Sequence, residues 1–249
     1  MKKCLKFVFV SFWLIITLNP LHSQVKQSHT IAVGFLQLKD QFNFGMIFNG
    51  VQLEYRYGLR WNINDHEILY QPKLNFGIGF NRGIMGFQMK LAPINVTWTM
   101  PFYKQNGHTI RGGANLTADY SYQVYPDLHI GHLFWASEIG ISPVVQYSYQ
   151  WENRRIGVNV QNSLLGFTSH TQEVEPYWFS LKAREWFVTP HENMKFGSFD
   201  KYNHTTVSFE FVPNIEKKHS WLYEFDYFGS YYGAEFSRLN HNLIWRMAL

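Results

Sequence analysis

Apolar and polar residues alternate along most of the chain with a period of two. Between Val51 and Trp61, apolar or aromatic residues occupy every odd position, and polar residues or glycine occupy every even one. The range 110–124 repeats the pattern over a longer stretch. Successive side chains of a β-strand point to opposite faces, so each segment is expected to form a strand with one apolar and one polar face. Since no window of similar length has a helical period, the pattern predicts an all-β fold.

Two architectures place apolar and polar residues on opposite faces of many strands. A soluble β-sandwich or lipocalin-like barrel turns the apolar face inward, whereas a transmembrane barrel turns it toward lipid. The alternating segments exceed the roughly 5–6 residues of typical soluble strands and reach the roughly 9–11 needed to cross a bilayer. Aromatic residues gather at their ends, and charged residues lie in mid-strand on the polar faces. These features favour a transmembrane antiparallel up-and-down β-barrel.

The preferred assignment has twelve strands. They occupy residues 28–38, 49–61, 67–80, 84–100, 109–123, 133–151, 154–167, 176–188, 193–200, 203–213, 220–228 and 234–249. The alternation of apolar and polar positions shifts by one residue at Pro93. Odd positions such as Leu91 are apolar before it, and even positions such as Ile94 are apolar after it, which predicts a β-bulge. In the section 168–202, the stretch from Tyr177 to Val188 alternates, but its Glu185 would fall on the lipid face near the rim. If this section forms a surface loop instead, the barrel has ten strands.

An even strand number places both chain ends on one side of the membrane. The turns expected on that side are Asn62–His66, Pro101–His108, Glu152–Asn153, Thr189–Glu192 and Asn214–His219. Six tryptophans would lie near them as an interfacial girdle, namely Trp61, Trp98, Trp151, Trp186, Trp221 and Trp245. The loops expected on the opposite side are Lys39–Phe48, Tyr125–His132 and Gly229–Gly233.

The first residues have the pattern of an export signal. Three lysines precede an apolar stretch at 7–18, and the small residue Ser23 follows at a plausible cleavage position. We therefore expect residues 1–23 to be a signal peptide and residues 24–249 to form the barrel. A membrane anchor is the alternative, for which the apolar run is short. The single cysteine, Cys4, would be removed with the signal, so disulfides would not stabilise the mature chain.

Composition narrows the class further. The chain of 249 residues is 46% hydrophobic, 18% aromatic and 16% charged, which excludes a disordered chain. Its mean hydropathy of −0.24 is too low for a bundle of membrane helices. The formal net charge of +4 comes largely from the three lysines of the expected signal. The remaining charge is nearly balanced, and no basic run indicates a nucleic-acid partner.

With these features the chain resembles the outer-membrane β-barrel proteins of Gram-negative bacteria. The resemblance covers about residues 28–249 and includes a final strand with Leu243, Trp245 and Met247 on one face. Barrels of this type usually end in an aromatic residue, from which Leu249 departs. The signal ending at Ser23 is similar to those of Bacteroidota. The resemblance implies a location in the cell outer membrane and contact with outer-membrane lipid and lipopolysaccharide, and no narrower family is indicated.

The polar face of the expected strands would line the lumen. Its basic residues are Arg56, Arg60, Lys73, Lys90, Arg111, Arg155, Lys182, Arg184, Lys195 and Arg246. Its acidic residues are Glu54, Asp119, Glu138, Glu210, Glu224 and Asp226. Rows of opposite sign across a lumen are used by selective pores to orient a polar or anionic solute. The alternative is that these groups pair across a narrow barrel and plug it.

Three functions follow from this chemistry. The preferred hypothesis is a narrow channel, or porin, for small polar or anionic solutes. The second is a non-conducting structural or accessory subunit of a larger outer-membrane complex, with protein partners. The third is an outer-membrane lipid hydrolase or protease, but His204 and Glu210, which share a face, would stand about 20 Å apart along a strand. His129 and His132 lack a third ligand, so neither catalytic residues nor a metal or other cofactor are expected.

Overall fold

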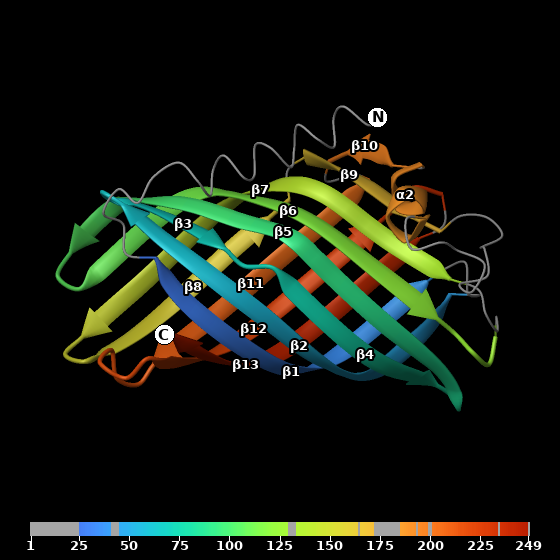
Figure 1. Cartoon of the computed structure of the whole chain (residues 1–249), viewed down its shortest axis with the longest axis horizontal. Helices are drawn as coiled ribbons and strands as arrows, with labels where there is room; N and C mark the ends of the chain where they lie inside the picture. The colour runs from blue at the N-terminus through green and yellow to red at the C-terminus, as the bar shows by residue number, and fades with distance from the viewer. Residues whose placement is uncertain are drawn as a thin grey trace.

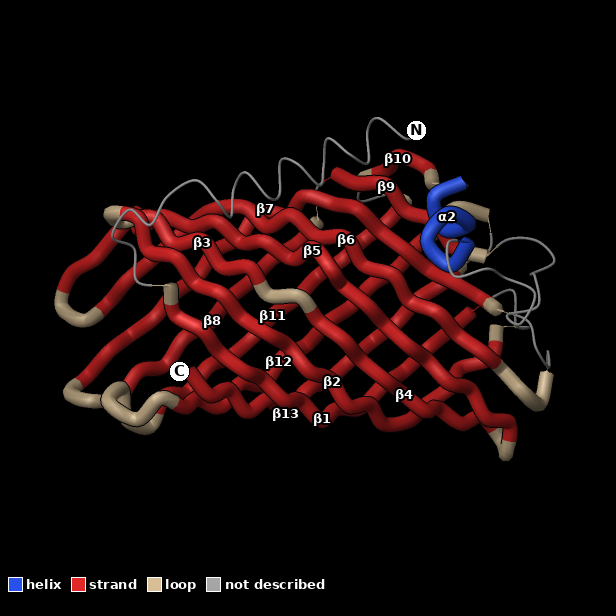
Figure 2. The backbone as a smooth tube through the Cα atoms, viewed as in Figure 1, coloured by secondary structure: helices blue, strands red, loops and turns tan. Residues whose placement is uncertain are grey.

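The computed structural model describes residues 25–40, 45–128, 133–163, 165–171, 185–192, 194–198, 201–233 and 235–248. The expected signal peptide, 1–23, lies outside these residues and stays a prediction. The described strands curve around a common axis into a long barrel (Figure 1). Strands make up the wall, and the described helix lies at one end of it (Figure 2).

All strand pairs are antiparallel. The elements are β1 (Lys26–Asp40), β2 (Met46–Ile63), β3 (His66–Tyr70), β4 (Lys73–Asn81), β5 (Ile84–Gln105), β6 (His108–Val124), β7 (Phe134–Trp151), β8 (Arg154–Asn162), β9 (Leu165–His170), α2 (Glu185–Glu192), β10 (Lys195–Gly197), β11 (Tyr202–Val212), β12 (His219–Ser230) and β13 (Phe236–Ala248). Strand β1 pairs with both β2 and β13, and β7 pairs with both β6 and β8. Because β8 also pairs with β11, the ring of neighbours is closed.

The wall has ten strand positions, which is the alternative expected from the sequence rather than the preferred twelve. Strands β3 and β4 share one position between β2 and β5. Strands β8 and β9 both pair with β7, at different heights, and β10 pairs only with β9. The predicted antiparallel up-and-down barrel is thus confirmed, with β9, α2 and β10 inserted in the chain between the neighbouring wall strands β8 and β11.

The section 168–202 contains the two wrong strand predictions. Residues 185–192, expected as the end of a strand and a turn, form helix α2, and 176–184 lie outside the described residues. The expected strand 193–200 is reduced to β10, which lies outside the ten-position wall. An extended conformation here would have turned Glu185 toward lipid, where a charge is costly.

One barrel end, which we call the turn end, carries both ends of the described chain and the turns that follow β2, β5, β7 and β11. Ser28 of β1 pairs with Ala248 of β13 at this turn end (Figure 1). The expected turns at 62–66, 152–153 and 214–219 are all here. The turn expected at 101–108 is shorter, because β5 continues to Gln105.

Pro93 marks an irregularity in the wall, as predicted. The register between β5 and β6 shifts between Leu91 and Ile94. The gap between β3 and β4 lies beside it, where the Gln71 N–H donates to the Asn95 carbonyl at 2.8 Å. The Asn95 side-chain amide donates back to the Gln71 carbonyl at 3.0 Å. Because proline has no N–H for the ladder, a bulge places it where no donor is needed.

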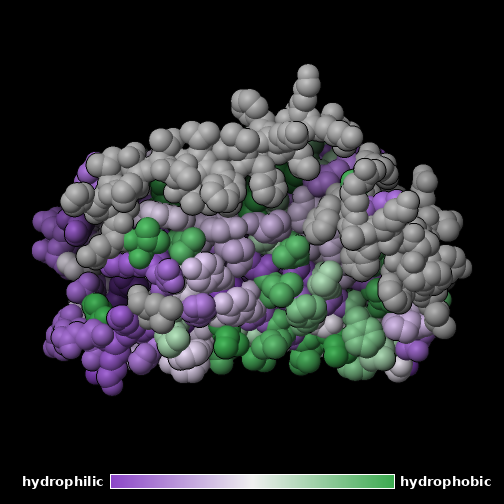
Figure 3. All heavy atoms as spheres, in the orientation of Figure 1, coloured by the Kyte–Doolittle hydropathy of each residue, from purple (hydrophilic) through white to green (hydrophobic). Residues whose placement is uncertain are grey.

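The barrel is apolar outside and polar inside, the reverse of a soluble barrel. On β2, Val51 and Leu53 are 63% and 55% exposed, whereas Gln52 and Glu54 are each 3% exposed. Apolar residues occupy the visible middle of the outer surface, and hydrophilic ones cluster at the turn end (Figure 3). In water this surface would be unstable, whereas a closed barrel in lipid satisfies both its backbone and its apolar face. No helix within the described ranges is long and apolar enough to cross a membrane.

Candidate functional site

Charged side chains fill the middle of the lumen. We call the charge belt the set of residues Glu54, Arg56, Lys90, Asp119, Glu138, His204, Glu224, Asp226 and Arg238. They project from seven strands around the barrel, and none is more than 9% exposed. Alternation explains why they face inward, since each occupies the polar phase of its strand.

Asp226 of β12 is the centre of the charge belt. Its carboxylate lies 2.7 Å from His204 Nε2 on β11 and 3.4 Å from Lys90 Nζ on β5. Arg238 Nη2 on β13 is 3.7 Å away. Lys90 and Arg238 also contact Asp119, at 2.8 and 3.4 Å. The two cations therefore stand between two carboxylates from different strands, and the lumen is bridged at this level.

The remaining charges extend this network across the barrel. Arg56 binds Glu224 through two parallel contacts of 2.8 and 2.5 Å, and it also contacts its neighbour Glu54. The other ring nitrogen of His204, Nδ1, contacts Glu138 of β7. Every charged group of the belt thus has an oppositely charged partner, a requirement for burying charge at low cost.

Amide side chains pack beside the belt. Gln52 donates to Asn242 at 2.6 Å and accepts from Asn75 at 2.9 Å. All three residues are at most 3% exposed. Together with the belt they form a buried layer of hydrogen-bonded polar side chains in mid-barrel.

Apolar residues fill the lumen toward the end opposite the turns. This apolar plug consists of Leu36, Leu38, Phe48, Tyr125, Phe134, Ala136, Tyr202, Phe228 and Phe236. All nine are at most 2% exposed. The Arg238 guanidinium lies over the Phe228 ring at 5.5 Å from its centroid, which joins the plug to the charge belt.

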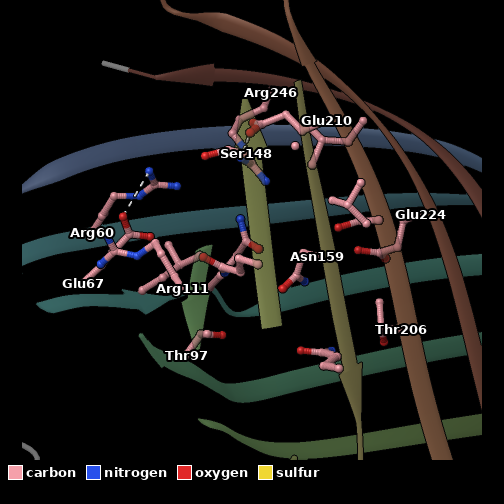
Figure 4. Close-up of a pocket in the computed structure, with 18 of the residues that line it drawn as sticks. Arg60, Glu67, Thr97, Arg111, Ser148, Asn159, Thr206, Glu210, Glu224 and Arg246 are labelled. Carbon is pink, nitrogen blue, oxygen red and sulfur yellow. Dashed lines mark hydrogen bonds and ion pairs between the residues drawn. The ribbon is translucent and has the colours of Figure 1, made fainter. Parts of the chain in front are cut away.

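A polar cavity opens on the other side of the belt, toward the turns. This vestibule has a volume of about 190 Å³ and is lined by five arginines from four strands, Arg56, Arg60, Arg111, Arg155 and Arg246. Figure 4 labels Arg60, Arg111 and Arg246 among them. Glu210 accepts from Arg155 at 3.1 Å and from Arg246 at 2.9 Å. Arg60 and Glu67 are 3.7 Å apart, Glu224 also lines the cavity, and Arg111 donates to Thr99 and to the Asp65 carbonyl.

The structure distributes the expected lumen residues along the axis rather than in opposed rows. Lys90 and most acids of the charge belt lie in mid-barrel, whereas Arg60, Lys73, Arg111, Arg155, Arg246 and Glu210 line the vestibule. Arg56 and Glu224 belong to the belt and also line the vestibule. Lys182 and Arg184 lie outside the described residues. Lys195 is not in the lumen, because β10 is outside the ten-position wall, and its ammonium lies 5.8 Å from the centroid of the Tyr232 ring.

Two belt residues were not recognised as lumen residues from the sequence. Arg238 lies an even number of residues before Arg246 on the final strand, so the two side chains point to the same face. Alternation alone could therefore have identified Arg238 as a lumen residue. The sequence places His204 on a face with Glu210, whereas its partners in the structure are Glu138 and Asp226. Those partners come from other strands, and sequence spacing carries no signal for them.

Of the six tryptophans expected in the girdle, all but Trp186 lie at the turn end. Trp221 pairs directly with Trp245, and they are 48% and 36% exposed. Trp61 and Trp98 lie at one level on either side of Ile68. Trp151 adjoins the 152–153 turn. The prediction for Trp186 is wrong, because it belongs to α2 at the opposite end (Figure 1).

Helix α2 contacts the barrel wall beside β7 and β9. His191 Nε2 and the Tyr120 hydroxyl are 2.9 Å apart, and partial burial lowers the pKa of His191 below its ordinary value. Ser169 accepts a hydrogen bond from the Trp135 indole at 3.3 Å. Across the described part of the chain, no group of three His, Cys, Asp or Glu residues is placed to hold a metal ion.

The sequence matches no protein-family model and no curated protein. Neisserial surface protein A has a TM-score of 0.36 and 9% identity, over 89% of this chain and 96% of its own. An outer membrane channel from Pseudomonas putida F1 has a TM-score of 0.37 and 7% identity, over 93% and 99%. The translocator domain of the autotransporter NalP from Neisseria meningitidis has a TM-score of 0.40 and 5% identity, over 99% and 97%.

These similarities concern the fold alone, and no residue role is transferred from them. The closed barrel of this chain rests on its own strand pairing, which confirms the fold that the sequence resemblance implied. The similarity of the signal to those of Bacteroidota stays a prediction.

Proposed function

We propose that the chain is an outer-membrane β-barrel with a closed lumen, serving as a non-conducting structural or accessory barrel. The apolar outer face supports insertion in lipid, and the expected export signal supports the outer membrane. In this arrangement the turn end faces the periplasm. Outer-membrane lipid covers the apolar face, and protein partners would meet the barrel at its ends.

The charge belt is the observation that carries this proposal. A water-filled pore keeps its lining charges hydrated, whereas every belt residue here is at most 9% exposed. The belt connects strands on opposite sides of the barrel, and the apolar plug lies behind it. An ion passing through would have to separate buried ion pairs, each of which costs several kcal/mol to break.

A narrow channel for small polar or anionic solutes is the second candidate. The observation in its favour is the basic vestibule, which would concentrate anions at one mouth. In a channel the charge belt would act as a gate that rearranges to admit the solute.

Planar-bilayer recording of the purified full chain separates the two candidates. The closed barrel should give no conductance steps at any voltage, with insertion checked by protease protection. As a positive control, the triple variant Phe134→Ala, Phe228→Ala and Arg238→Ala removes side chains from the plug and the belt, and should conduct if it inserts. Reproducible steps from the unmodified chain would overturn the closed-barrel proposal and support the channel.

A further inference from the structure

We propose that the vestibule is a binding site for a small oxyanion with at least two negative charges, such as a phosphate ester, that enters from the turn end. This site is separate from the closed-lumen proposal, because binding at the mouth requires neither passage through the barrel nor its absence.

The charge of the lining supports an anion. A second cavity of about 230 Å³ adjoins the vestibule at the rim and shares Arg60, Arg155, Glu210 and Arg246 with it. Together the two cavities are lined by nine lysines or arginines and three glutamates. The rim contributes Lys26, Lys217 and Lys218. Such a concentration of one sign in a concave surface focuses the field and attracts the opposite charge.

The arginines retain donors for a ligand. Arg155 and Arg246 share the carboxylate of Glu210, each through one terminal nitrogen. A guanidinium has five N–H donors, and the Nε atoms of both residues are buried without a hydrogen-bond partner in the described structure. Two guanidinium groups that share one carboxylate leave an excess of one positive charge. A doubly charged oxyanion would balance this charge and accept hydrogen bonds from the unused N–H groups. Arginine suits this role because its planar fork matches phosphate oxygens.

The acids nearby do not cancel this excess. Glu224 is held by the two contacts from Arg56, and Glu67 lies 3.7 Å from Arg60. Lys73 lines the same cavity on β4, and Arg111 lines it on β6. Figure 4 shows Arg60, Arg111 and Arg246 reaching the cavity from different strands. The basic groups thus surround the cavity.

The size and depth fit a small ligand. A volume of about 190 Å³ corresponds to about six water molecules of liquid, enough for one or two phosphoryl groups. The charge belt forms the floor of the cavity, so a bound group would be retained at the mouth.

Titration calorimetry tests the proposal on the full chain in detergent micelles, with pyrophosphate as the probe and acetate as the singly charged control. Pyrophosphate should bind, and acetate should bind at least about tenfold more weakly. The variant Arg155→Gln should weaken pyrophosphate binding about tenfold, which corresponds to about 1.4 kcal/mol. Its matched control is Arg154→Gln, which removes the same charge from the adjacent, exposed residue outside the lining. This control should bind as the unmodified chain does.

The outcomes are distinct. No heat with pyrophosphate would overturn the site, and equal losses in both variants would show diffuse attraction to a basic surface instead. The variant Lys73→Gln provides a second measurement if Arg155→Gln does not fold, and it should also weaken binding. Conductance is measured separately, so a conducting chain that binds pyrophosphate would refute the closed lumen and leave this site intact.

Discussion

Replacing Asp226 by asparagine removes one charge from the charge belt and keeps the size of the side chain. The Asp226 carboxylate accepts from Asn240 at 3.1 Å and contacts His204 at 2.7 Å. Lys90 and Arg238 lie 3.4 and 3.7 Å away. Because Asp226 is 3% exposed, water cannot replace the lost partner, and the two cations would depend on Asp119 alone.

The structure sets the size of the expected effect. Breaking a buried ion pair by removing one partner costs about 3–5 kcal/mol, whereas an exposed pair contributes about 0–1 kcal/mol. The matched control is the Lys39–Glu235 pair, which has a similar 3.1 Å contact but side chains that are each 37% exposed. We expect Asp226→Asn to lower the free energy of unfolding by about 3–5 kcal/mol, and Glu235→Gln by less than about 1 kcal/mol.

Urea unfolding from lipid vesicles, followed by tryptophan fluorescence, measures both variants. The comparison uses the midpoint and slope of each transition, so a change in the slope would reveal a change in the folded or unfolded state. If the two variants lose the same free energy of unfolding, burial adds nothing to the Asp226 contacts, and the physical basis for a closed lumen fails.

Two further predictions test the wall and the turns by the same unfolding assay. Leu53→Arg places a charge at a 55% exposed, lipid-facing position in mid-strand and should cost about 2–4 kcal/mol, whereas Ile63→Arg beside the turn should cost about 0–1 kcal/mol. Equal costs would contradict a membrane around the middle of the barrel. Gly107 has a φ of 81°, so Gly107→Ala should cost about 1 kcal/mol or more, and Gln105→Ala should be nearly neutral. A neutral Gly107→Ala would show that the turn tolerates a side chain in the left-handed region.

The strands of the wall could be predicted well because their signal is local. The segments 49–61 and 109–123 lie within β2 and β6, and the irregularity at Pro93 falls where the apolar phase changes. The prediction failed at 185–188, which belong to α2, and among the described residues of 193–200, where only Lys195–Gly197 form a strand and that strand lies outside the wall. A short alternating segment fits a strand or a turn of helix equally well when no neighbour is known.

The candidate site could be predicted only in part. The alternation of inward and outward positions along each strand placed Arg56, Lys90 and Asp119 inside the barrel, and they are buried there. The alternation did not show that Lys90 forms an ion pair with Asp119. The two residues lie on adjacent strands, and the distance between them depends on the register of those strands. The charges expected as opposed rows are instead divided between ion pairs in mid-barrel and the lining of the vestibule.

The sequence by itself determined most strands of the wall and which face of each is polar, because side-chain direction in a strand follows a period of two. Only the tertiary structure decided the number of strands, because closure depends on β8 pairing with β11 across a long connection. It also decided the level of each charge along the axis, which is set by the stagger between strands and has no local signal. That stagger separates a buried charge belt from a basic vestibule.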